Sequence, residues 1–198
     1  MPLLLLLFMA LPALAQEPPS NLELVRRIME QQLAEVEPRM ALADSSLLCY
    51  GSPAPQAAWD WLFERVVFER LGERRALRLR RADAAAAERP FLYYVPVDLN
   101  IRYESAGGSG RRIIRTVASR LHLNYLDGSG ELLFSGELNG SVSDTLARSQ
   151  IAAVEDQGLP FTIGKRPQSS LLRRMAEPVV MALVAGGIMY LFYSFRSN

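Results

Sequence analysis

A single histidine and a single cysteine have the greatest catalytic potential in this sequence. His122 and Cys49 could form a nucleophilic pair if the fold placed them within hydrogen-bond reach. A zinc site would need further ligands beyond these two. Cys49 lies in an apolar run, where a thiol normally packs as a small hydrophobic group. We therefore predict that the chain is not an enzyme and has no catalytic residue, metal or cofactor; a hydrolase using His122 is the alternative.

The familiar motifs of hydrolases and phosphate-binding loops are absent from the sequence. It contains no G-x-S-x-G, S-x-x-K or H-E-x-x-H pattern. The glycine-rich stretches 107–110 and 128–130 lack the spacing of a phosphate-binding loop, and each lies between two predicted strands. We interpret both as hairpin turns.

The positive charge of the chain is carried almost entirely by arginine. Of the 22 Lys and Arg residues only Lys165 is a lysine, and the net charge of +1 indicates no nucleic-acid partner. Arginines gather at 70–81 and at 111–115, and glutamates are interleaved with the first group. Such mixing is typical of a solvated face with ion pairs. The alternative is an anionic partner, such as lipid headgroups or another protein.

The elements that would position these side chains begin with two helices and two short strands. Ser20 and Glu23 have the spacing of a capping box, and Pro38 ends the helix that follows. Hydrophobic periodicity then predicts a buried strand, a second helix and another strand. The predicted ranges are helix 22–37, strand 46–50, helix 55–71 and strand 76–81.

Three further strands show the alternation of an antiparallel meander, at 91–103, 112–126 and 131–142. In the first of them, the odd-numbered residues from Phe91 to Tyr103 are predicted to share the apolar face. Pro96 lies on the polar face and indicates an edge position or a bulge. The aromatic residues Phe91, Tyr93 and Tyr103 could instead line a site for a small ligand. A helix at 144–156 is predicted to follow.

Both ends of the chain are apolar and predict targeting segments. The run 3–14 ends at the small residues Ala13 and Ala15, which have the spacing of a cleavage site. This pattern is typical of a secretory signal; the alternative is an uncleaved anchor. The stretch 178–195 contains no charged residue. At about 1.5 Å per residue it reaches about 27 Å, close to the apolar thickness of a bilayer, about 30 Å. A buried core helix is the alternative.

Together the two segments predict a single-pass protein of the inner membrane, with its domain on the periplasmic side. The predicted parts are a signal peptide 1–15, a periplasmic α+β domain 16–166, a juxtamembrane segment 167–177, a transmembrane helix 178–195 and a cytoplasmic tail 196–198. Arg173 and Arg174 are candidates for contact with lipid headgroups. Ala182 and Gly186 have the spacing of a helix-dimer face, which makes a homodimer through the membrane helix a candidate.

Two resemblances bear on these predictions. The tail with Glu177-Pro178, Tyr190-Leu191-Phe192-Tyr193 and Arg196-Ser197 resembles the end of uncharacterised bacterial exported proteins with a C-terminal membrane anchor, over residues 144–198, and implies no activity. The order of elements from Leu22 to Val142 loosely resembles the periplasmic α/β domain of curli-secretion and TolB amino-terminal proteins. That resemblance is one of topology only and implies an interaction module.

The predicted fold class is α+β: an antiparallel meander sheet with helices packed on one face, plus one C-terminal transmembrane helix. The predicted function is a membrane-tethered periplasmic interaction or scaffold module of the bacterial cell envelope, with an envelope protein as partner and no nucleic acid. The alternatives are an envelope hydrolase using His122 and a small-ligand carrier.

Overall fold

The fold was analysed in a computed structural model of the chain. The structure describes residues 17–40, 42, 46–53, 57–73, 76–82, 90–107, 111–166, 181 and 183–188. The predicted signal peptide, the juxtamembrane segment and the cytoplasmic tail lie outside these residues.

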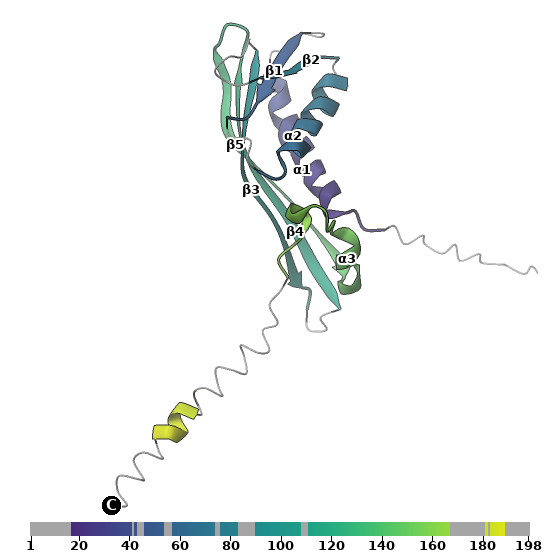
Figure 1. The fold of residues 1–198 in the computed structure, drawn as a ribbon, viewed down its shortest axis with the longest axis vertical. Helices are drawn as coiled ribbons and strands as arrows, with labels where there is room; N and C mark the ends of the chain where they lie inside the picture. Colours follow the sequence, from purple (N-terminus) through teal and green to yellow (C-terminus); the bar gives the residue numbers. More distant parts are fainter. Residues whose placement is uncertain are drawn as a thin grey trace, which may run out of the picture.

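A five-stranded mixed sheet carries two main helices on one face (Figure 1). The strands lie in the order β2-β1-β3-β4-β5, where β1 is parallel to β2 and β3, and β3 to β5 form an antiparallel meander. The elements are α1 (Asn21–Val36), β1 (Leu47–Gly51), α2 (Asp60–Val67), β2 (Arg78–Arg81), β3 (Phe91–Ser105), β4 (Arg112–Leu126), β5 (Leu132–Ala147) and α3 (Ile151–Val154). The α+β class, the meander and the one-sided helices are confirmed; the two parallel pairs were not predicted.

Helix α1 begins at the predicted cap and runs along the last strand of the sheet. The Ser20 hydroxyl accepts a hydrogen bond from the Glu23 backbone N–H, as a cap should. Further along, an added Cβ at Gly140 of β5 would lie 2.3 Å from Cγ2 of Ile28, so helix and strand are in close contact there. The buried stripe of α1 therefore covers β4 and β5, the two strands with which it makes most of its sheet contacts.

A β-bulge divides β3 into two halves with opposite alternation. The register with β4 shifts between Pro96 and Asp98, which leaves Val97 unpaired and exposed. Before the bulge, even-numbered residues such as Leu92 and Tyr94 face the helices; after it, Ile101 does. The predicted bulge is confirmed. The prediction of one continuous odd-numbered apolar face is wrong, because one extra residue reverses the side on which every later side chain lies.

The predicted helix at 144–156 is largely wrong. Strand β5 continues to Ala147, and a 3₁₀ turn at Arg148–Gln150 leads into the single turn of α3. Leu146 pairs with Ile113 and is buried, so strand pairing covers an apolar side chain that the pattern alone assigned to a helix. Tertiary pairing thus overrides local propensity at the end of β5.

A buried arginine joins the start of α1 to the end of the sheet where β4 begins and β5 finishes. Arg115 is fully buried on the helix side of β4 and forms a bidentate ion pair with Asp144 of β5. Its Nη1 donates to the Pro19 carbonyl at 2.8 Å and to Oδ1 of Asn21 at 2.9 Å. Asn21 in turn donates to the hydroxyl of Tyr103 at 2.7 Å. This network fixes the residues before α1 against the sheet.

The helix side of the sheet also contains tyrosines whose ionisation opposes folding. Burial, and then its hydrogen bond to Glu64, strongly raise the pKa of Tyr94 above the ordinary 10.0. Burial also raises the pKa of Tyr50, Tyr103 and Tyr125. The pKa of each phenol is higher in the folded state than in the unfolded state. The contribution of the neutral phenols to the free energy of unfolding is therefore complete below about pH 10, and it is lost as the pH rises through the folded-state pKa values.

We therefore expect an alkaline unfolding transition in which tyrosinate absorbance and loss of secondary structure rise together. Tyr94→Phe should move this transition to higher pH, because it removes the residue with the largest shift in pKa. The measurement is a pH titration followed in parallel by absorbance and circular dichroism. Tyrosinate signal from all tyrosines well before unfolding would contradict the expectation.

In the described part of the chain, the helices are all too short or too polar to cross a membrane. Of the predicted span 178–195, residues 181 and 183–188 are described, and they are helical. The side chains of Met181, Leu183, Val184 and Ile188 are apolar and more than half exposed.

Candidate functional site

The candidate site is the open face of the sheet, defined here as the side of β3, β4 and β5 opposite the helices. Side chains on this face come from the even-numbered residues of β4 and, up to the bulge, from the odd-numbered residues of β3. On β5 they come from the odd-numbered residues between Ser135 and Ala147, all of which are exposed. The face is predominantly polar at its centre and is reached by solvent, as predicted for the side away from the helices.

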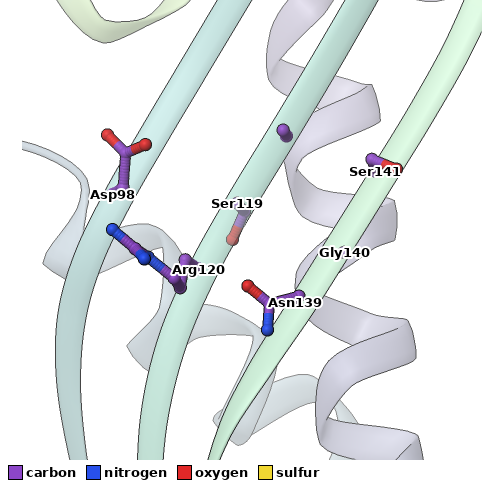
Figure 2. A pocket seen from close by; sticks show the side chains of 7 residues that line it. Asp98, Ser119, Arg120, Asn139, Gly140 and Ser141 are labelled. Atoms are coloured by element: carbon purple, nitrogen blue, oxygen red, sulfur yellow. The ribbon is translucent and has the colours of Figure 1, made fainter.

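A shallow depression of about 390 Å³ lies at the centre of the open face. Figure 2 shows the side chains of Asp98, Arg120, Asn139 and Ser141 around it, contributed by three adjacent strands. The floor is low because Ala118 of β4 has only a methyl group there, and the backbone of Gly140 lines the floor from β5. The hollow is rimmed by a carboxylate, a guanidinium and an amide.

Arg120 is the central charge of this depression. It lies directly across from Asp98 on β3 and from Asn139 on β5. Its Nε is 3.5 Å from a carboxylate oxygen of Glu137, and both side chains are nearly half exposed. An exposed ion pair of this kind is weak, so the guanidinium is available to exchange its partner for another anionic group.

His122 lies on the open face next to Arg120, as the alternation predicted. Its strand neighbours are Val95 on β3 and Glu137 on β5. Among the described residues, no hydrogen bond or ion pair of His122 is found, and the carboxylate of Glu137 is oriented to Arg120. Within the described residues, His122 thus lies opposite Glu137 without a hydrogen bond to its carboxylate.

Cys49 is buried on β1 and is not brought near His122. It pairs with Phe91 of β3, which pairs with Leu126 of β4, four residues beyond His122. Two strand spacings and four residues correspond to a separation of more than about 10 Å. In the described part of the chain, His, Cys, Asp and Glu side chains do not come together in a group of three that could hold a metal.

The aromatic residues proposed for a ligand carrier do not share one surface. Phe91 and Tyr93 lie on the open face with ring centroids 6.4 Å apart. Tyr103 lies beyond the bulge, faces the helices and is held by Asn21. The change of side at Val97 therefore removes the common aromatic face on which that alternative was based.

An acidic cluster on α2 was missed by the sequence analysis. Glu64 accepts a hydrogen bond from Tyr94 at 2.8 Å and lies 3.1 Å from Arg81 of β2. Asp60, one turn earlier, has its pKa raised chiefly by burial. The spacing of four between the two carboxylates was the available signal. Because Glu64 already has two partners and Tyr94 is fully buried, we assign this cluster to joining α2 to the sheet.

The interleaved charges near α2 form the ion-paired face that the sequence predicted. Arg70 pairs with Glu37 at 2.6 Å, and Arg65 pairs with Glu69 at 2.7 Å. The first pair joins the end of α1 to the segment that follows α2, and the second links neighbouring turns of the α2 segment. The residues proposed for headgroup contact, Arg173 and Arg174, and Ala182 of the proposed dimer face lie outside the described residues.

Gly186, the other residue of the proposed dimer face, lies in the described helical segment 183–188. An added Cβ there would meet no atom within 4 Å.

Comparisons with known proteins leave the chain without a family assignment. No family model matches it, and no curated protein matches its sequence. One solved structure that aligns with it is the solution NMR structure of uncharacterized lipoprotein B from Nitrosomonas europaea. The alignment covers 71% of this chain and 86% of that chain, at 17% sequence identity and a TM-score of 0.34. A similarity at this level does not establish a shared fold, so function is argued from the chain's own residues.

Proposed function

We propose that this chain is a membrane-tethered interaction module of the bacterial cell envelope. Its periplasmic domain would bind another envelope component through the open face of the sheet, without catalysis. The single observation that carries the proposal is the depression around Arg120, an exposed polar surface on the face that the helices leave uncovered. Polar side chains fixed on three strands suit recognition of a partner surface.

The membrane tether rests on the C-terminal sequence. The stretch 178–195 is uncharged, and its described residues are helical with exposed apolar side chains. Exposed apolar groups of this number are costly in water and are stabilised in a bilayer. Together with the apolar N-terminal run, this arrangement would hold the domain on the periplasmic side of the inner membrane.

The proposal is tested by photo-crosslinking in intact cells. A photoreactive residue at Ala118, on the floor of the depression, should give an adduct with an envelope component in the membrane fraction. A second substitution, Arg120→Glu, should reduce this adduct about tenfold, because one charge-assisted hydrogen bond contributes about 1.5–3 kcal/mol.

The matched control is the same photoreactive residue at Arg65, which is exposed on α2. It should give no such adduct. Adducts of equal yield from both positions, or an adduct at Ala118 that is insensitive to Arg120→Glu, would contradict a specific partner on the open face. Release of the chain from membranes by alkaline carbonate would contradict the tether.

A further inference from the structure

Strand β5 has one side paired with β4 and one side unpaired within the described part of the chain. The Arg148 N–H donates to the Arg111 carbonyl at 2.9 Å. This bond shows which residues of β5 form hydrogen-bonded pairs with β4. Since antiparallel pairs alternate between hydrogen-bonded and non-hydrogen-bonded, the even-numbered residues of β5 bond to β4. The N–H and C=O groups of the odd-numbered residues from Ser135 to Thr145 therefore point outward, whereas the Ala147 N–H donates to the side chain of Gln150 at 2.8 Å. This free edge extends over about 33 Å at about 3.3 Å per residue.

The free edge lacks the features that usually prevent strand pairing. Between Leu132 and Ala147 there is no proline, lysine or arginine, and the charged residues there are Glu137 and Asp144. The strand pairs with β4 without a register shift from Ala147 to Phe134. A long, regular edge of this kind is a template for another strand.

We propose that two copies of this chain pair through the free edges of β5, with a two-fold axis at Gly140. Antiparallel pairing about this axis keeps the helices of both copies on the same side of one continuous sheet. Leu138 then lies opposite Val142 of the second copy on the helix side. Glu137 lies opposite Ser143 of the second copy, and Asp144 lies opposite Gly136, so like charges do not face each other.

Helix α1 supplies independent support for a second copy as the occupant. Its side toward α2 is marked by Arg26, whose guanidinium is 3.2 Å from Glu69 in the helical segment that follows α2, so the opposite side of α1 lies toward the free edge. That opposite side carries Arg27, Gln31 and Glu35, which are exposed and spaced four residues apart. Across the axis, the two α1 helices would lie about 10 Å apart, a normal helix-packing distance of about 8–10 Å.

The charges on this side of α1 are complementary under the same axis. Gly140 lies over Ile28 and Gln32, so an axis through Gly140 passes close to Gln31. The two α1 helices are then antiparallel, and Arg27 of each copy faces Glu35 of the other. The charges of the helix are thus compatible with the axis placed through Gly140 on the strand. The dimer uses the free edge of β5 and the proposed partner surface uses the open face, so either can fail without the other.

The test measures the mass and dissociation constant of the full chain in detergent by sedimentation. We expect a dimer for the wild-type chain and for Ser141→Ala. Ser141→Pro should weaken it at least tenfold, because it removes an outward N–H while leaving the hydrogen bonds to β4 intact. A monomeric wild-type chain, or a dimer insensitive to Ser141→Pro, would overturn the proposal; the latter would indicate association through the membrane segment.

A charge exchange on α1 tests the axis without altering the strand. Arg27→Glu alone should weaken the dimer about tenfold, since it places two glutamates opposite each other. The double variant Arg27→Glu with Glu35→Arg should restore the wild-type dissociation constant. Circular dichroism establishes that each variant is folded. Failure of the double variant to recover the dimer would overturn the proposed axis.

Discussion

Replacing Arg115 with alanine is expected to lower the free energy of unfolding by about 3–5 kcal/mol, the usual cost of removing one partner of a buried ion pair. The guanidinium is fully buried and has partners on three segments: Asp144 on β5, the Pro19 carbonyl before α1, and Asn21 at its first turn. Its loss leaves the buried Asn21 and the Pro19 carbonyl without this donor, and leaves the carboxylate of Asp144, which is 29% exposed, without its counter-charge. Urea unfolding of the full chain, followed by tryptophan fluorescence, measures the change.

The control for this prediction is Arg112→Ala, a change of the same type at an exposed position of the same strand. It should alter stability by no more than about 0.5 kcal/mol, as surface substitutions usually do. A joint replacement, Arg115→Met with Asp144→Leu, should cost much less than Arg115→Ala, because no charge is left buried without a partner. Equal losses for Arg115→Ala and Arg112→Ala would show that the network contributes little.

Gly140→Ala is expected to destabilise the fold by about 1–3 kcal/mol, the usual range for overpacking. The added methyl group would lie 2.3 Å from Cγ2 of Ile28 and 3.3 Å from the side-chain amide of Gln32, so α1 must move away from β5. Gln32 donates to the carbonyls of Ser119 and Leu138, and displacement of the helix would weaken both bonds. Urea unfolding at a fixed protein concentration measures the loss.

A double-mutant cycle identifies the cause of this loss. In an Ile28→Ala background, Gly140→Ala should cost markedly less, because the atom that it meets is gone. Gly128→Ala, in the turn between β4 and β5 with no atom within 4 Å of the new methyl, is the control and should be close to neutral. Additive effects of Ile28→Ala and Gly140→Ala would show that contact with Ile28 is not responsible.

The local sequence pattern was sufficient to predict those elements whose conformation depends on their own residues. Helix α1 follows from the Ser20 cap and its apolar period, and β4 spans the predicted residues 112–126. The pattern failed where a neighbour decided the outcome. One extra residue at Val97 reverses the faces of β3, and pairing with β4 draws Asp144 into a strand. The parallel position of β1 depends on partners distant in the sequence, which periodicity does not encode.

The sequence predicted the open face more successfully than the polar groups buried beneath the helices. The polar side of β4, with Arg120 and His122, was recognised from alternation. Arg115 was grouped with the surface arginines of 111–115, which is wrong, because it stands at a core-facing position of β4 and is fully buried, with Asp144 at a core-facing position of β5. An arginine and an aspartate on the apolar sides of two adjacent strands are a detectable sign of a buried ion pair. The depression itself depends on three strands and required the structure.

The position of α1 also determines when this domain can finish folding. Gln32 of α1 bonds to residues 87 and 106 positions later in the chain, so α1, the first helix of the described residues, is covered by β4 and β5, the last two strands of that part. Until both strands are made, much of the apolar stripe of α1 lacks the surface that covers it, and contacts of such long range form slowly. We therefore expect the nascent chain to expose apolar surface until these strands are made. A circular permutant that begins at β1 and places α1 after β5 would shorten that interval.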